Sequence, residues 1–156
     1  MQSGGVLYSE RLTATRNQRL EYVMATTAET PLKVKSLVPS FTVDNLQQSI
    51  TFFEGLGFVV DERWEDKGVL QGVMLKAGDA EIGLSQDDWK KGRDRVKGVG
   101  MRLHIDTTQN IDELAAQAKK AGVKLDQEPA DTPWKTRAFE ATDPSGFKVT
   151  ISSPMK

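Results

Sequence analysis

Apolar and polar positions along this 156-residue chain follow the helical period in some stretches and the strand period in others. Between residues 46 and 56 the apolar side chains fall at helical spacing, Asp44 or Asn45 is placed to cap the helix, and Gly57 to end it. Short alternating or β-branched runs typical of strands surround this helix, at residues 34–43, 58–60, 62–66, 72–76 and 80–85. The pattern predicts one βαβββ module, with Pro39 at an edge or bulge of its first strand.

The same order returns in the second half of the chain. Residues 101–107 form a predicted strand, and residues 111–121 a helix with Asn110 as its cap and Gly122 as its stop. Further strands are predicted at residues 123–125, 137–141 and 147–151, the last two joined by the turn Asp143-Pro144-Ser145-Gly146. Two copies of a unit too small to bury its own face predict an internal duplication around one shared sheet.

The segments outside the modules set the predicted domain organisation. Residues 1–30 are expected to be a weakly structured or helical extension, and residues 31–156 a single domain. Module one spans residues 34–86 and module two spans residues 99–153. Residues 87–98 between them form a polar linker that ends in glycine. One hypothesis makes Met24 the natural start of the protein, and the other makes the extension a docking arm for a partner subunit.

Composition narrows the possible partners. With a net charge of -1 and no basic run interleaved with aromatics, we expect binding neither to nucleic acid nor to an anionic membrane. No apolar run approaches the roughly 18 residues needed to cross a bilayer. The chain has no cysteine, which excludes disulfides, thiolate metal sites and a cysteine nucleophile. These features predict a soluble, cytoplasmic protein.

Three stretches of the chain form a recognisable set: residues 41–58, the helix that leads to Ala121-Gly122-Val123, and Thr132-Pro133-Trp134 followed by the Asp143–Gly146 turn. Together they resemble the vicinal oxygen chelate superfamily, which contains glyoxalase I, extradiol dioxygenases and the fosfomycin and bleomycin resistance proteins. The resemblance covers residues 34–153. It implies an α+β fold, in which two βαβββ modules form an open, curved, mixed eight-stranded sheet around a central cleft, commonly in a homodimer.

The resemblance also locates the positions where metal-dependent relatives carry His or Glu. In this sequence they are Val38, Gly83, Gly100 and Thr150, none of which supplies a strong ligand for a divalent metal. We therefore expect no metal and no cofactor. The departure from the ligand pattern argues against glyoxalase I or dioxygenase activity.

If these four positions face the cleft, their neighbours two residues away face it too, because side chains alternate along a strand. Ser85 is among the residues that this rule turns inward. The predicted ligand-binding residues are Ser40, Thr42, Trp64, Glu81, Arg102, His104, Trp134, Lys148 and Thr150. No catalytic residue is assigned.

Several of these residues have two interpretations. His104, the one histidine of the chain, is either a base or hydrogen-bond donor in the cleft or a solvent-facing polar residue. Arg102 either clamps an anionic ligand or pairs with Glu81 across the strands. The tryptophans Trp64, Trp89 and Trp134 could wall a slot for a flat ligand. In the alternative interpretation Trp134 packs between the modules and Trp89 covers the linker.

The sequence therefore favours a metal-free binding protein, similar to bleomycin resistance proteins, that sequesters a small organic or antibiotic-like molecule. One alternative is a glyoxalase-like lyase or isomerase, or a dioxygenase-related enzyme, with an atypical site that uses Glu81 or His104. Another is a structural or regulatory module with a vestigial cleft. Searches for nucleotide-binding, nucleophile-elbow and zinc-protease motifs find none.

Overall fold

The computed structural model describes residues 30–156. By its internal contacts the chain divides into two units, Met1–Ser36 and Leu37–Lys156, and the second contains every helix and strand of the described residues. Both hypotheses about the extension, including Met24 as the natural start, concern residues outside the described range. Among the described residues, neither helix is long and apolar enough to cross a membrane.

The second unit consists of two βαβββ modules, as the hydrophobic pattern predicts. The first contains β1 (Ser40–Val43), α2 (Leu46–Gly55), β2 (Val59–Asp66), β3 (Val69–Ala77) and β4 (Ala80–Gln86). The second contains β5 (Arg102–Asp106), α3 (Ile111–Lys120), β6 (Leu125–Asp131), β7 (Thr136–Thr142) and β8 (Lys148–Pro154). Asn45, rather than Asp44, caps α2 by accepting from the Gln48 amide, and Asn110 caps α3 in the same way.

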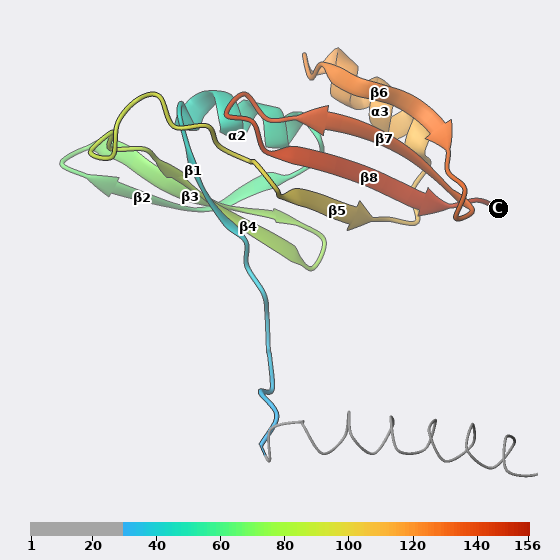
Figure 1. Cartoon of the computed structure of the whole chain (residues 1–156), viewed down its shortest axis with the longest axis horizontal. Helices are drawn as coiled ribbons and strands as arrows, with labels where there is room; N and C mark the ends of the chain where they lie inside the picture. The colour runs from blue at the N-terminus through green and yellow to red at the C-terminus, as the bar shows by residue number, and fades with distance from the viewer. Residues whose placement is uncertain (1–29) are drawn as a thin grey trace, which may run out of the picture. The chain divides into compact units, whose positions relative to one another are not determined.

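Each module contributes one open, mixed, four-stranded sheet (Figure 1). The first sheet has the order β1-β4-β3-β2 and the second the order β5-β8-β7-β6. In each sheet the first strand runs parallel to its neighbour and the other pairs are antiparallel. The matching order confirms the internal duplication and the α+β class with eight strands in two modules.

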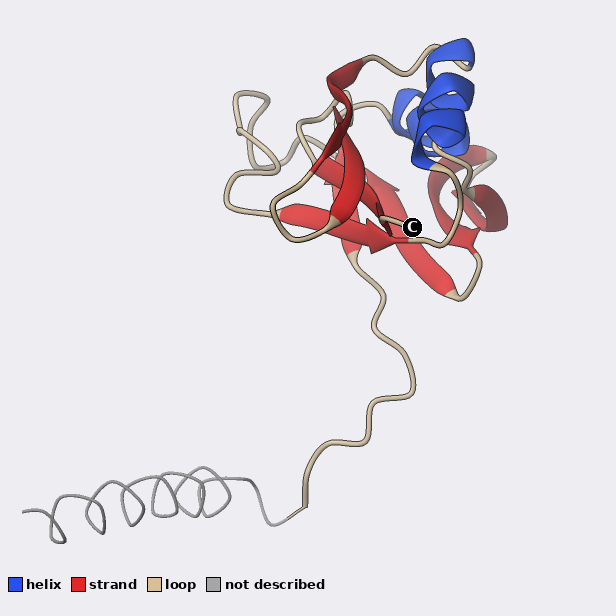
Figure 2. Cartoon of the chain, turned by 90° about the vertical axis from the view of Figure 1, so that its right-hand side faces the viewer, coloured by secondary structure: helices blue, strands red, loops and turns tan. Residues whose placement is uncertain are grey.

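The core joins the two modules on the helix side of both sheets. Alternation along the strands places Phe41 and Val43 of β1, and Val149 and Ile151 of β8, in one buried cluster with residues of both helices. Figure 2 shows the two helices together, and Gly55 at the end of α2 lies against Ala121 and Val123, which follow α3. The opposite face of each sheet, here called its inner face, carries mostly polar side chains.

The Asp143–Gly146 turn ties the second module to the first. The ring of Phe147 packs on that of Phe41 at 4.5 Å between centroids. The Ser145 hydroxyl accepts a hydrogen bond of 2.8 Å from the Asp44 amide. The predicted turn is thus also a contact between the modules, a role that its sequence alone does not reveal.

Some strand boundaries differ from those that the sequence predicts. β1 begins at Ser40 instead of residue 34, directly after Pro39, which has no N–H to donate. Residues 59–66 form one strand, because a bulge at Asp61 absorbs the break in the pattern. β6 continues to Asp131 despite Pro129, since it is an edge strand whose register shifts between Gln127 and Ala130.

Candidate functional site

The inner face of the first sheet presents one row of four paired residues. Thr42 lies beside Ser85, Ser85 beside Gly72, and Gly72 beside Trp64, on four adjacent strands. A Cβ atom at position 72 would lie 2.1 Å from the indole Cζ2 and 2.2 Å from Cε2. The indole therefore covers the backbone of β3, and the absence of a side chain at Gly72 makes this possible.

Three residues of this row, Thr42, Ser85 and Trp64, line a groove of about 510 Å³. The linker contributes Lys90, Lys91 and Arg95 to the same lining. Trp64 is 40% exposed, so part of its indole is available to a ligand. The groove thus combines an aromatic surface, two hydroxyls and a basic rim, which suits a flat organic molecule.

The linker is held beside the groove by a buried carboxylate. The side chain of Asp87 is 2% exposed and accepts a hydrogen bond of 2.9 Å from the Trp89 amide. It pairs with Arg95 and, at 2.7 Å, with Lys97, which also reaches Asp44. The Lys97 ammonium lies 4.6 Å from the centre of the Trp89 ring. This Asp87 clasp fixes both ends of the linker to the sheet.

The clasp shifts the pKa values of its members. The hydrogen bonds from Lys97 and from the Trp89 amide lower the pKa of Asp87 to about 2. Burial of Lys97 lowers its pKa, but the hydrogen bonds to Asp44 and Asp87 outweigh burial, and the pKa is raised overall. Both groups therefore stay charged across the neutral range.

The inner face of the second sheet carries a different set of polar groups. Arg102 pairs with Glu140 at 3.1 Å and donates to the Thr150 hydroxyl at 2.9 Å. The predicted alternative, an ion pair between Arg102 and Glu81, is wrong, because Glu81 lies in the other sheet and pairs with Lys76 at 3.3 Å. Glu140 is the partner that the sequence analysis missed; the period of β7 places it on the same face as Thr150.

The predicted binding residues fall into two groups and one outlier. Ser40, Thr42, Trp64 and Glu81 lie on the first sheet, and Arg102, His104, Lys148 and Thr150 on the second. His104 is exposed, and Thr150 is its register partner. Trp134 belongs to neither group: it lies in the turn between β6 and β7 and is 73% exposed. The structure therefore does not place Trp64 and Trp134 in one slot.

Arg102 and Lys148 line a second groove of about 520 Å³, together with residues 96–101 of the linker region and Gly146. The groove around Trp64 takes its lining from the first sheet and residues 87–95. Linker residues are thus part of both grooves. The sequence analysis assigned them only a solvated surface role, since their mixed charges are typical of one.

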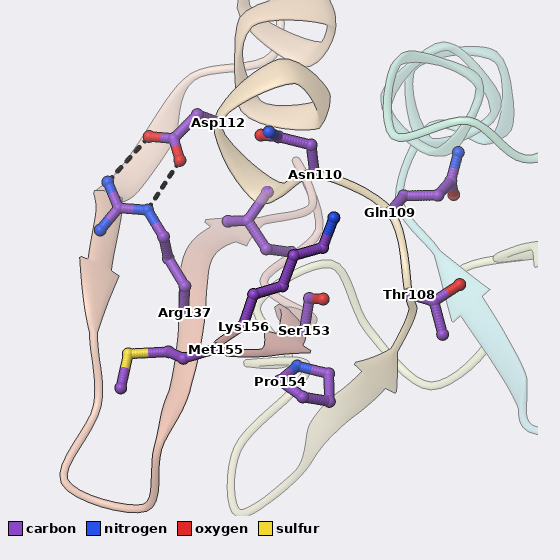
Figure 3. A pocket seen from close by; sticks show the side chains of 10 residues that line it. Thr108, Gln109, Asn110, Asp112, Arg137, Ser153, Pro154, Met155 and Lys156 are labelled. Atoms are coloured by element: carbon purple, nitrogen blue, oxygen red, sulfur yellow. Dashed lines mark hydrogen bonds and ion pairs between the residues drawn. The ribbon is translucent and has the colours of Figure 1, made fainter.

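A third hollow lies where α3 begins, between the helix and the end of β8 (Figure 3). Its most prominent charged group, Arg137, donates two hydrogen bonds to Asp112, at 2.7 and 2.8 Å, and one to Asp131 at 2.8 Å. These bonds lower the pKa of Asp112 and raise that of Arg137. Because the guanidinium is already paired twice, this hollow is a poorer anion site than its shape suggests.

Comparison with known proteins identifies the fold. A family model described as Glyoxalase/Bleomycin resistance protein/Dioxygenase superfamily matches residues 34–151. The chain belongs to this superfamily. The comparison with curated proteins finds no match.

Several solved structures share this fold. A hypothetical protein of S. aureus has a TM-score of 0.61 and 17% identity, over 78% of this chain and 95% of the other. TioX from Micromonospora sp. ML1 has a TM-score of 0.57 and 15% identity, over 78% and 98%. A glyoxalase/bleomycin resistance protein/dioxygenase from Alicyclobacillus acidocaldarius has 0.59 and 16%, over 83% and 96%. At these identities the similarity shows the fold.

The metal positions of the superfamily do not fit a metal in this chain. At Gly83, a side chain would meet the Ser40 hydroxyl, which lies 2.8 Å from where its Cβ would be. The Thr150 hydroxyl already accepts from Arg102. Val38 and Gly100 have no donor side chain, and within residues 30–156 no three His, Asp or Glu side chains gather as a metal site would require.

Proposed function

We propose that this superfamily member binds a small organic molecule, through the groove around Trp64, without a metal. The observation that supports this most is the indole spread over Gly72, partly exposed, with the hydroxyls of Ser85 and Thr42 on the next two strands of the same face. An exposed aromatic surface beside convergent polar groups is typical of a ligand site. Sequestration of an antibiotic-like or aromatic compound needs no further chemistry.

We also propose that the protein works as a homodimer. In the single chain each inner-face groove is open and lined from one sheet, the first around Trp64 and the second around Arg102. β1 pairs only with β4, and β5 pairs only with β8. Among the described residues, β1 and β5 are therefore edge strands whose second side is unpaired. A second copy would supply the opposite wall of each groove.

An enzymatic role has less support. Of the two groups that a glyoxalase-like isomerase could use, Glu81 is engaged with Lys76 at 3.3 Å and His104 is exposed. Proton transfer requires its donors and acceptors within hydrogen-bond reach of one substrate.

The test is calorimetric titration of the full chain with naphthamide and with bleomycin, before and after treatment with a chelator. We expect Trp64→Ala to abolish binding of the probe that the wild type binds, and Trp134→Ala, the matched control, to leave it intact. Binding that survives Trp64→Ala, disappears on chelation or is absent for both probes would contradict the proposal. Light scattering tests the dimer, and a mass of one chain at assay concentration would refute it.

A further inference from the structure

We propose that the ligand of the Trp64 groove is a planar aromatic anion, whose charged group lies against Lys90 and Lys91 of the linker. This inference rests on the proposed function, because it names the ligand class of the same groove. Two observations support it. The carboxylates around the groove are paired with basic side chains, and the remaining charges orient a bound anion toward the linker.

The carboxylates that line the groove are both occupied. Asp87 is buried and holds Arg95 and Lys97. Asp88 accepts from the Lys90 amide at 3.0 Å and pairs with the Lys90 ammonium at 3.2 Å. Each carboxylate that lines the groove is therefore matched by at least one basic side chain.

The basic side chains at the groove are less completely paired than the carboxylates. Within residues 30–156, Lys91 has no carboxylate partner. The pair between Lys90 and Asp88 is exposed, with 83% and 59% of the side chains accessible, and exposed pairs contribute little energy. The lining of the groove holds three basic side chains against these two carboxylates. The linker side of the groove thus has an uncompensated positive charge.

The other direction along the inner face is negative. The row next to Trp64 pairs Ser40 with Gly83, Gly83 with Met74, and Met74 with Glu62. Glu62 is exposed and lies two residues before Trp64 on the same strand, so it shares that face. A bound molecule with one anionic end therefore places that end at the linker. Its neutral rings then lie over Trp64 and Met74.

The shape of the site requires the aromatic part. The indole lies across the backbone at Gly72 instead of pointing into solvent, so it offers its face, which attracts another ring by stacking. Thr42 and Ser85 beside it can donate to an acceptor on the ring system. An aliphatic anion would use the lysines but gain nothing from Trp64.

The experiment compares three probes of one shape on the full chain by calorimetry: naphthoate, naphthamide and naphthylmethylammonium. We expect naphthoate to bind about tenfold more tightly than naphthamide, because hydrogen bonds to a charged group are roughly twice as strong as neutral ones. This advantage should shrink as salt is added. The double variant Lys90→Gln/Lys91→Gln should remove this advantage, so that naphthoate and naphthamide bind equally tightly. Lys124→Gln, an exposed lysine outside this groove, is the control.

The outcomes separate this inference from the proposed function. If naphthamide binds as tightly as naphthoate and both are lost in Trp64→Ala, the groove binds ligand but the anion inference is wrong. Tightest binding of naphthylmethylammonium would overturn it too, in favour of Asp88 or Glu62 as the determinant. If no probe binds in a Trp64-dependent way, both proposals fail.

Discussion

The indole of Trp64 occupies the space that a side chain at Gly72 would fill, across two neighbouring strands of the first sheet. A tryptophan on a strand usually stands away from the sheet. Here it lies on the backbone of β3, which makes the surface of the groove rigid and flat. The position of the indole depends on the absence of a Cβ atom at Gly72, and it can be tested by adding one.

Gly72→Ala should displace the indole and destabilise the fold by about 1–3 kcal/mol, as overpacking does. Tryptophan fluorescence should shift to the red, since the displaced ring is more exposed. Urea unfolding measures the stability. The matched control is Gly83→Ala on the neighbouring strand, where the new Cβ meets only the mobile Ser40 hydroxyl. An equal loss of stability in both variants would show that Trp64 has no special relation to Gly72.

Much of this arrangement could be predicted from the sequence, because it follows from periodicity. The polar face of Thr42 and Ser85 is the direct result of Phe41, Val43 and Leu84 turning to the helix. Pairing across strands is harder to predict, because a bulge at Asp61 and another irregularity between Trp64 and Glu65 set which residue faces Gly72. The sequence therefore identified Trp64 as a candidate, but could not give its partner.

A second test concerns the contact between the linker and the Asp143–Gly146 turn. A Cβ at Gly98 would lie 2.1 Å from the Gly146 carbonyl oxygen, a backbone atom that cannot move aside. Gly98 also has a positive φ of 74°. Gly98→Ala thus adds a steric clash to the backbone strain, and we expect it to separate the linker from the turn.

Gly68→Ala is the matched control, because Gly68 has a φ of 78° but open space where its Cβ would lie. It isolates the cost of the positive φ, about 1–2 kcal/mol. Gly98→Ala should cost at least about 1 kcal/mol more than this in urea unfolding, as overpacking against a fixed neighbour does. If the two variants lose the same stability, the linker and the turn can move apart without cost, and the contact does not stabilise the fold.

The Asp87 clasp predicts a dependence of stability on acid. The folded-state pKa of Asp87, about 2, lies below its usual value of 3.8. Between these values the unfolded chain binds a proton that the folded chain does not, so stability falls as the pH falls through this window. Asp87→Asn should flatten this part of the profile in urea unfolding at a series of pH values. Asp94→Asn, an exposed linker carboxylate, should keep the wild-type slope, and a wild-type slope in Asp87→Asn would contradict the clasp.

The clasp also shows why the linker's role was not predictable. Its alternating acids and bases are typical of a solvated segment, and nothing in their spacing marks Asp87 as buried. Lys97 pairs with both Asp87 and Asp44. These three residues come together only when the second module places the end of the linker beside the start of α2. Long-range ion pairs of this kind leave no local pattern. The same holds for Arg102, whose partner Glu140 lies 38 positions further on.

The buried Asp143 should show the opposite dependence on pH. Burial raises its pKa above 3.8, against the smaller lowering effects of the neighbouring Ser49 and Ser145. Between 3.8 and the raised value the folded chain binds a proton that the unfolded chain has lost, so stability falls as the pH rises through this window. Asp143→Asn removes the titrating group and should remove this loss.

The same variant tests the turn that Asp143 supports. One carboxylate oxygen accepts from the Ser145 amide at 2.7 Å, while the other and the Ser49 hydroxyl are buried without a well-formed hydrogen bond. An asparagine keeps the acceptor and gains an amide that can donate to Ser49. At neutral pH we expect Asp143→Asn to be at least as stable as the wild type in urea unfolding. Asp143→Ala, which leaves the Ser145 amide unpaired, should lose about 1–3 kcal/mol. If both variants lose stability equally at neutral pH, the carboxylate charge itself is required, and the burial argument is wrong.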